Sequence, residues 1–92
     1  MPLHCIAKSG ANPQKLQTAL DWACGVGKAD WSPLQPGQPC YEPNNVFVHA
    51  SYAFDAYYHQ MGKTKEACDF NGVAAFTTAD LSHGSCKLPG SL

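Results

Sequence analysis

The sequence predicts a small α+β domain in which two main helices pack with a small antiparallel sheet and disulfide bonds staple the fold. Two segments carry apolar residues at helical spacing, and an Asn-Gly pair separates two short apolar runs. The chain has 92 residues and five cysteines, a dense cysteine content for this length. A short chain buries only a modest core, and disulfides commonly compensate for this. We therefore expect residues 1–92 to form a single stapled domain.

The first predicted helix begins at Asn12 and ends at Gly25. Asn12 can cap its first turn, and Pro13 suits the first helical position because an N–H there would be unpaired anyway. Residues 5–9 precede this helix as a short strand or extended lead-in, and Cys24 on its last turn is well placed to tether it. The apolar stripe of the helix consists of Leu16, Ala19, Leu20 and Ala23.

The second predicted helix follows a proline-rich loop over residues 26–43. It runs from a cap at Asn44 or Asn45 to about Met61. Its apolar stripe consists of Phe47, Ala50, Phe54, Tyr57 or Tyr58, and Met61. The opposite face, which we expect to be exposed, carries Val48, Tyr52, Asp55 and His59.

The strongest hairpin signal lies after the second helix. Residues 67–70 and 73–77 flank Asn71-Gly72, and this pair supplies the positive φ angles that a type I′ turn requires. This hairpin is expected to form the antiparallel sheet. The tail that follows is expected to be mostly loop, with a short strand around Cys86.

Charge, hydropathy and residue spacing exclude several function classes. The formal net charge is −1, and the chain lacks the basic stripe that neutralises nucleic-acid phosphates. No apolar run is long enough to span a bilayer. The acidic residues fall in no recognisable catalytic pair, and Cys40 with His49 lacks an orienting third group, so we expect no enzyme activity. The cysteines and histidines lack zinc-site spacing, and we expect no metal or cofactor.

The cysteine content predicts an oxidising compartment and therefore a secreted, extracellular protein. Met1 precedes a polar segment without the apolar stretch of a signal peptide, so we expect the natural signal to be removed or to lie upstream. Five cysteines leave at least one thiol without an intramolecular partner. Any of them could be the free one, and the other four pair in three ways, so the residues alone leave the connectivity open.

Tyrosine side chains are the best candidates for ligand binding. A tyrosine ring has an apolar face and a hydroxyl, and a sugar ring likewise has an apolar C–H face with a fringe of hydroxyls. Tyrosines beside Asn, His or Asp therefore match a glycan. The alternative is that tyrosines at helical spacing belong to the core and expose only an edge. The rings in question are Tyr41, Tyr52, Tyr57 and Tyr58.

Several ordered segments resemble the X8 domain family, also called carbohydrate-binding module family 43. They are residues 20–25 (LDWACG), 29–32 (ADWS), 40–45 (CYEPNN), 49–54 (HASYAF) and 68–74 (CDFNGVA). With matching cysteine spacing, they extend the resemblance over nearly the whole chain. The resemblance implies two main helices, a small antiparallel sheet and non-catalytic binding of β-1,3-glucans such as callose or laminarin. It implies a location in the plant cell wall, with plasmodesmata or a membrane-anchored parent protein as further options.

Other functions remain open beside glucan binding. One is a structural or protein-interaction module of the cell wall without significant glycan affinity. Another places the chain as the binding part of a longer β-1,3-glucanase. In each case we expect a monomer.

The resemblance also implies a disulfide pattern. The implied bridges are Cys5–Cys68 and Cys24–Cys86. The family has a cysteine where this chain has Trp31, and the resemblance makes that missing cysteine the partner of Cys40. Cys40 is therefore expected to be the free thiol, either buried and inert or exposed and able to form an intermolecular disulfide.

Two aromatic positions depart from the family pattern. Trp31 either covers local apolar surface or adds a stacking platform beside the glycan site. His4 stands where the family usually has tryptophan before its first cysteine.

We expect a shallow glycan site around the start and exposed face of the second helix. Tyr52 is expected to stack on a glucose ring, with Tyr41 as a second platform. The hydrogen-bonding residues of this site are expected to be Asn44, Asn45, His49 and Asp55. Some of them have structural alternatives, namely the helix cap for either asparagine and a donor that pins the loop for His49.

Overall fold

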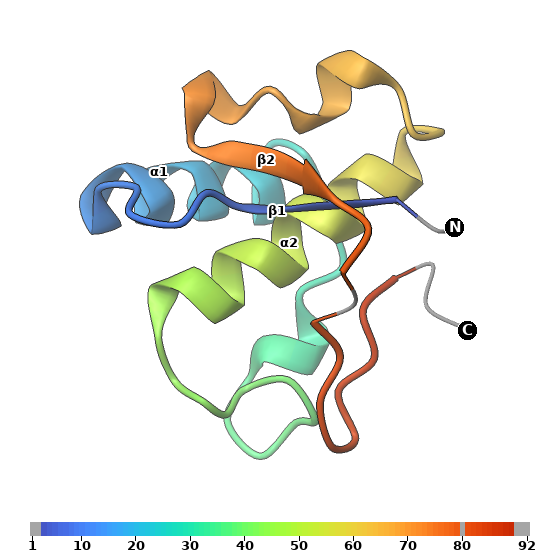
Figure 1. Ribbon diagram of the computed structural model, residues 1–92. Helices are drawn as coiled ribbons and strands as arrows, with labels where there is room; N and C mark the ends of the chain where they lie inside the picture. Colours follow the sequence, from blue (N-terminus) through green and yellow to red (C-terminus); the bar gives the residue numbers. More distant parts are fainter. Residues whose placement is uncertain (1–2, 80, 90–92) are drawn as a thin grey trace.

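The computed structural model describes residues 3–79 and 81–89. Two helices dominate it, and a two-stranded antiparallel sheet lies against them (Figure 1). This architecture confirms the predicted α+β class. In chain order the elements are β1 (His4–Ala7), α1 (Pro13–Cys24), the 3₁₀ helix η1 (Ser32–Leu34), α2 (Val46–Gln60), the 3₁₀ helices η2 (Lys65–Cys68) and η3 (Phe70–Gly72), and β2 (Ala74–Thr77).

Helix α1 begins and ends as the sequence predicts. The Asn12 side-chain oxygen accepts hydrogen bonds from the backbone N–H groups of Gln14 and Lys15, at 2.8 and 3.2 Å. These bonds satisfy donors that the first turn of any helix leaves unpaired. The helix then buries its predicted stripe against α2, with Leu16, Leu20 and Ala23 as its buried residues.

Helix α2 is the central element of the fold. Asn45 is its cap, because its Oδ1 accepts a 2.8 Å hydrogen bond from the Val48 N–H. The helix packs against both α1 and β1, so it is covered on more than one side. The prediction that Asp55 lies on an exposed face is wrong, because β1 crosses that side of the helix and leaves Asp55 0% exposed.

The sheet forms between strands that are far apart in the sequence. Strand β2 pairs antiparallel with β1, in a register that places His4 opposite Thr77 and Ala7 opposite Ala74. The predicted hairpin is wrong, because residues 65–72 form 3₁₀ turns and not a strand. Asn71 and Gly72 do adopt positive φ angles of 53° and 82°. They serve in the turn that leads into β2.

Two disulfides join the ends of the described chain to its interior. Cys5–Cys68 ties β1 to η2, which confirms one predicted bridge. The second bridge is Cys40–Cys86, and Cys24 is the free thiol. The predictions of a Cys24–Cys86 bridge, of a free Cys40 and of an intermolecular disulfide through Cys40 are therefore wrong.

The position of the C-terminal segment explains the observed second bridge. Residues 81–89 lie against the loop that precedes α2, where the His83 ring nitrogen Nε2 is 3.0 Å from the Glu42 carbonyl oxygen. A single antiparallel bridge, His83–Cys86, stands where the short strand around Cys86 was expected. Because a disulfide requires its two Cα atoms to lie about 4.4–6.8 Å apart, Cys86 pairs with the cysteine of that loop, at a Cα separation of 4.8 Å.

None of the helices within residues 3–79 and 81–89 has the length and apolar character needed to cross a membrane.

Candidate functional site

Three of the predicted site residues come together at one hollow of about 480 Å³. Tyr41, Asn44 and His49 line one side of it, and residues of α1 and the loop that follows line the other. Trp31 belongs to the same lining and is 51% exposed. We call this depression the Trp31 hollow. It lies at the start of α2, where the sequence predicts the site.

The loop before α2 is held in place by His49. Its Nε2–H donates a 2.7 Å hydrogen bond to the Tyr41 carbonyl oxygen, and the two rings lie 5.6 Å apart. The Asn45 side-chain oxygen caps the helix. Asn45 therefore has the structural role of a cap, and His49 has the structural role of pinning the loop through its Nε2 atom. Asn44 is exposed on the rim of the hollow. The geometry thus separates residues that position the loop from residues that can reach a ligand.

Trp31 projects from an ordered turn. The Asp30 carboxylate accepts hydrogen bonds from the Ser32 hydroxyl and the Ser32 N–H, at 2.8 and 3.1 Å. These bonds favour the ionised form and hold the pKa of Asp30 below its usual value. The Trp31 carbonyl oxygen in turn accepts from Leu34 N–H, so the backbone under the indole is fixed.

Tyr52 and Asp55 are not among the residues that line the Trp31 hollow. Tyr52 is half-buried on α2, and its pKa is raised, chiefly by burial and further by the negative charges of Asp30 and Asp55. Asp55 is fully buried and accepts a 2.8 Å hydrogen bond from the Cys5 N–H. The structure therefore does not bring the predicted central tyrosine and its carboxylate neighbour to the hollow.

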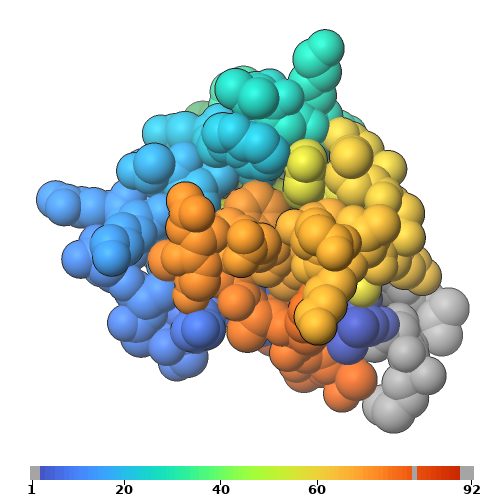
Figure 2. Space-filling view, turned by 90° about the horizontal axis from the view of Figure 1, so that it is seen from above, coloured from blue at the N-terminus to red at the C-terminus, as the bar shows by residue number. Residues whose placement is uncertain are grey.

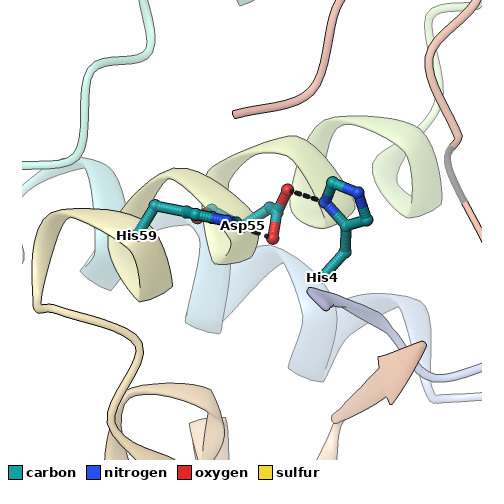
Figure 3. A group of neighbouring side chains, drawn as sticks. All are labelled: His4, Asp55 and His59. Carbon is teal, nitrogen blue, oxygen red and sulfur yellow. Dashed lines mark hydrogen bonds and ion pairs between the residues drawn. The ribbon is translucent and has the colours of Figure 1, made fainter. Parts of the chain in front are cut away.

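Asp55 belongs instead to a cluster with His4 and His59 (Figure 3). His4 Nδ1 lies 2.7 Å from Asp55 Oδ2, and His59 Nδ1–H donates to the Asp55 backbone carbonyl at 2.9 Å. Burial raises the pKa of the Asp55 carboxyl, and the hydrogen bonds from Cys5 and His4 offset part of that effect.

The same cluster has the residue types of a metal site. One ligand atom from each of the three side chains lies within 4.8 Å of the others. However, the His4 and His59 Nδ1 atoms and the Asp55 carboxylate already bond to one another or to backbone. The His4 Nε2 atom is buried without a hydrogen-bond partner among the described residues. We interpret the cluster as a structural link between β1 and α2, because His4 and Cys5 of β1 both contact the Asp55 carboxylate of α2.

The free thiol, Cys24, lines the Trp31 hollow. Burial, and to a lesser extent the charge of Asp21, raise the pKa of this thiol to about 11, so it is protonated at neutral pH and a poor nucleophile. Because Cys40 is bonded to Cys86, Cys24 is the free cysteine left to pair with the cysteine that the resemblance implies at position 31, and both positions line the same hollow. The error in the predicted pairing came from assigning that missing cysteine to Cys40.

A second hollow, of about 720 Å³, lies on the other flank of α1, where it meets η2 and η3. Figure 2 shows this face, with α1 in blue and the 65–72 segment in yellow and orange on either side of a depression. Its aromatic lining comes from Trp22, Tyr57 and Phe70. We call it the Trp22 groove. Sequence reasoning missed Trp22, because it flanks the apolar stripe of α1 and its partners come from distant elements.

Comparisons with known proteins identify the family. A model of the X8 domain matches residues 3–75. The chain is 59% identical over 88 residues to glucan endo-1,3-beta-glucosidase 2 of Arabidopsis thaliana, covering 96% of this chain and 17% of that protein. It is 48% identical over 89 residues to plasmodesmata callose-binding protein 5 of the same species, covering 97% of this chain and 49% of that protein. The chain thus spans about half or less of these relatives.

A relative from wheat (Triticum aestivum), a glucan endo-1,3-beta-glucosidase, is 46% identical over 83 residues, covering 90% of this chain and 18% of that protein. Because the family model covers most of the sequence, the chain belongs to the X8 domain family.

Proposed function

We propose that this chain is a non-catalytic module that binds β-1,3-glucan at the Trp31 hollow. The observation that carries the proposal is the joint presence of two aromatic rings, Trp31 and Tyr41, with amide and carboxylate groups around one concave surface. The names of the relatives support this ligand, since one is a callose-binding protein and others are glucan endo-1,3-beta-glucosidases.

The chemistry of the hollow suits a neutral sugar chain. An exposed indole presents a flat apolar surface on which the C–H face of a glucose ring stacks. Polar groups that can bond the sugar hydroxyls surround it, from Gln17, Asp21, Gln35 and Asn44. Sites for small ligands usually combine such an apolar surface with a few well-placed polar groups.

We assign the predicted site residues different roles within this hollow. Tyr41 and Asn44 contact the glucan, and Trp31 acts as the added stacking platform. His49 positions Tyr41 through its hydrogen bond, and Asn45 caps the helix. Tyr52 lies outside the lining of the hollow. Asp55, which we expected to contact the ligand, has a structural role instead.

The lining of the hollow argues for binding without cleavage. Glycoside hydrolysis by the common mechanisms requires two carboxyl groups that flank the scissile bond. Among the described residues that line the Trp31 hollow, Asp21 contributes the carboxylate. We therefore expect no release of reducing sugar from laminarin by the isolated chain.

The disulfides and the relatives support an extracellular location. Structural disulfides persist in oxidising compartments, and the two bridges join segments 63 and 46 residues apart. We propose that the module acts in the plant cell wall, at callose deposits such as those of plasmodesmata, as part of a longer protein.

Affinity electrophoresis in gels that contain laminarin tests this function. We expect retardation in laminarin and none in hydroxyethylcellulose or xylan, and Trp31→Ala or Tyr41→Ala should markedly reduce the retardation in laminarin. The matched control is Phe76→Ala, because Phe76 is an exposed aromatic outside both hollows, 43% exposed. No retardation of the wild-type chain would reject glucan binding and favour a structural or protein-interaction module.

A further inference from the structure

We propose that the Trp22 groove is a second contact surface for β-1,3-glucan, so that one domain holds the polysaccharide at two places on either flank of α1. This inference rests on the function proposed above and adds a second site to it. It is carried by the aromatic cluster of the groove, by the mixed polar rim and by the relation of the two hollows to α1.

The aromatic rings of the groove hold one another in fixed orientations. Trp22 packs edge-on against Tyr57 at 5.2 Å and against Phe70 at 6.3 Å between ring centroids. Phe70 stacks on Phe54 at 4.1 Å, and Phe54 is fully buried in the core. The indole is therefore anchored to the core through two layers of rings, although 43% of Trp22 remains exposed.

A fixed, exposed tryptophan is a suitable platform for a sugar ring. Large aromatic side chains lose little conformational entropy on binding when their neighbours already restrain them. Folding has therefore already restricted the Trp22 side chain, so ligand binding should reduce its conformational entropy little. The volume of about 720 Å³ falls within the ~300–1,000 Å³ that small-ligand sites occupy.

The rim of the groove favours an uncharged polyhydroxyl ligand. The lining contains one basic residue, Lys15, and two acidic residues, Glu66 and Asp69, so both signs of charge are present and the formal sum is only −1. Amide and hydroxyl groups complete the rim, and these can hydrogen-bond sugar hydroxyls, although the Asn12 oxygen caps α1 and the Thr18 hydroxyl donates to the Gln14 carbonyl. These rim groups belong to Asn12, Gln14, Thr18 and Asn71.

The two hollows use opposite flanks of the same helix. One flank, which lines the Trp31 hollow, carries Gln17, Leu20, Asp21 and Cys24. The other flank, which lines the Trp22 groove, carries Lys15, Thr18, Ala19 and Trp22. Each hollow therefore contains one tryptophan. A polymer bound at both hollows gains avidity, because the second contact forms within a complex that the first contact has already made.

The two tryptophans allow each site to be observed separately, since the chain contains no others. In Trp31→Phe the emission reports on Trp22, and in Trp22→Phe it reports on Trp31. We expect laminarihexaose to change the emission of both variants in a saturable manner, while cellohexaose changes neither. Retained circular dichroism would establish that both variants are folded.

The possible results separate the two proposals. If only the Trp31 reporter responds, the second surface is rejected while glucan binding stands. If neither reporter responds and the wild-type chain migrates freely in laminarin gels, both are rejected. If the Trp22 reporter responds, the groove is a glucan site.

A second measurement tests avidity on the polymer. Trp22→Ala should weaken the apparent affinity for long laminarin by about 100-fold or more, as expected when one of two linked contacts is lost. The exposed aromatic control, Phe76→Ala, should leave that affinity unchanged. Equal affinities for wild type and a folded Trp22→Ala variant would overturn the proposal.

Discussion

At the scale of single residues, the Asp55 carboxylate joins the N-terminal strand to the central helix. It accepts from Cys5 N–H and faces His4 Nδ1, both from β1, at 2.8 and 2.7 Å. These contacts lie beside the Cys5–Cys68 bridge. The carboxylate therefore fixes the register in which β1 crosses α2.

We expect Asp55→Ala to lower the free energy of unfolding by about 2–4 kcal/mol, because it leaves two buried nitrogen groups without their acceptor. Asp55→Asn should cost less. Its amide oxygen can still accept from Cys5 N–H, and burial already disfavours the charged carboxylate, as its raised pKa indicates. Urea denaturation at neutral pH measures both values, and equal losses for the two variants would contradict this role.

At the scale of elements, α1 ends at Cys24, the free thiol among the described residues. Cys24 is the last residue of α1 and lines the same hollow as Trp31. The resemblance to the X8 family places a cysteine at position 31. The loop between these two positions is short, and its turn is already ordered by Asp30 and Ser32.

We expect Trp31→Cys to form a disulfide with Cys24 and to raise the free energy of unfolding by about 2–3 kcal/mol in the chain-entropy model. The variant should contain no titratable thiol after oxidation, and thermal melting should show the gain. The same change removes the aromatic platform, so retardation in laminarin gels should weaken. Trp31→Ser serves as the control that lacks both ring and thiol.

At the scale of the whole molecule, two long-range bridges hold together segments that are distant in the sequence. They close loops of 63 and 46 residues. In the chain-entropy model, each constrains the unfolded state by about 4 kcal/mol. Most of a small domain's net stability can depend on such constraints.

The paired variant Cys40→Ser/Cys86→Ser should lose about 3–4 kcal/mol of stability, whereas Cys24→Ser should change it little. Chemical denaturation measures this difference. Peptide mapping of the native chain should recover a fragment that links residues 40 and 86. A recovered link between Cys24 and Cys86 would contradict the observed connectivity.

The local features of the fold could be predicted from the sequence because their causes lie within a few residues. Asn12 with Pro13, and Asn45 before Val46, determine where both helices begin through side-chain caps and backbone geometry. Helical spacing of apolar residues likewise identified the buried face of α1. Tyr41, Asn44 and His49 lie together because they surround one helix start, and their contact with a ligand stays a prediction.

The tertiary structure alone decided the features that depend on partners distant in sequence. The 74–77 strand pairs with β1 and not with its own neighbours, Cys86 meets Cys40 and not Cys24, and Asp55 is covered by β1. The Trp22 groove likewise needs rings from two other elements. The cysteine density of the sequence was enough to predict a disulfide-bonded chain. Which cysteines pair was decided only by the packing of residues 81–89 against the loop before α2, because a disulfide forms between cysteines that are neighbours in space.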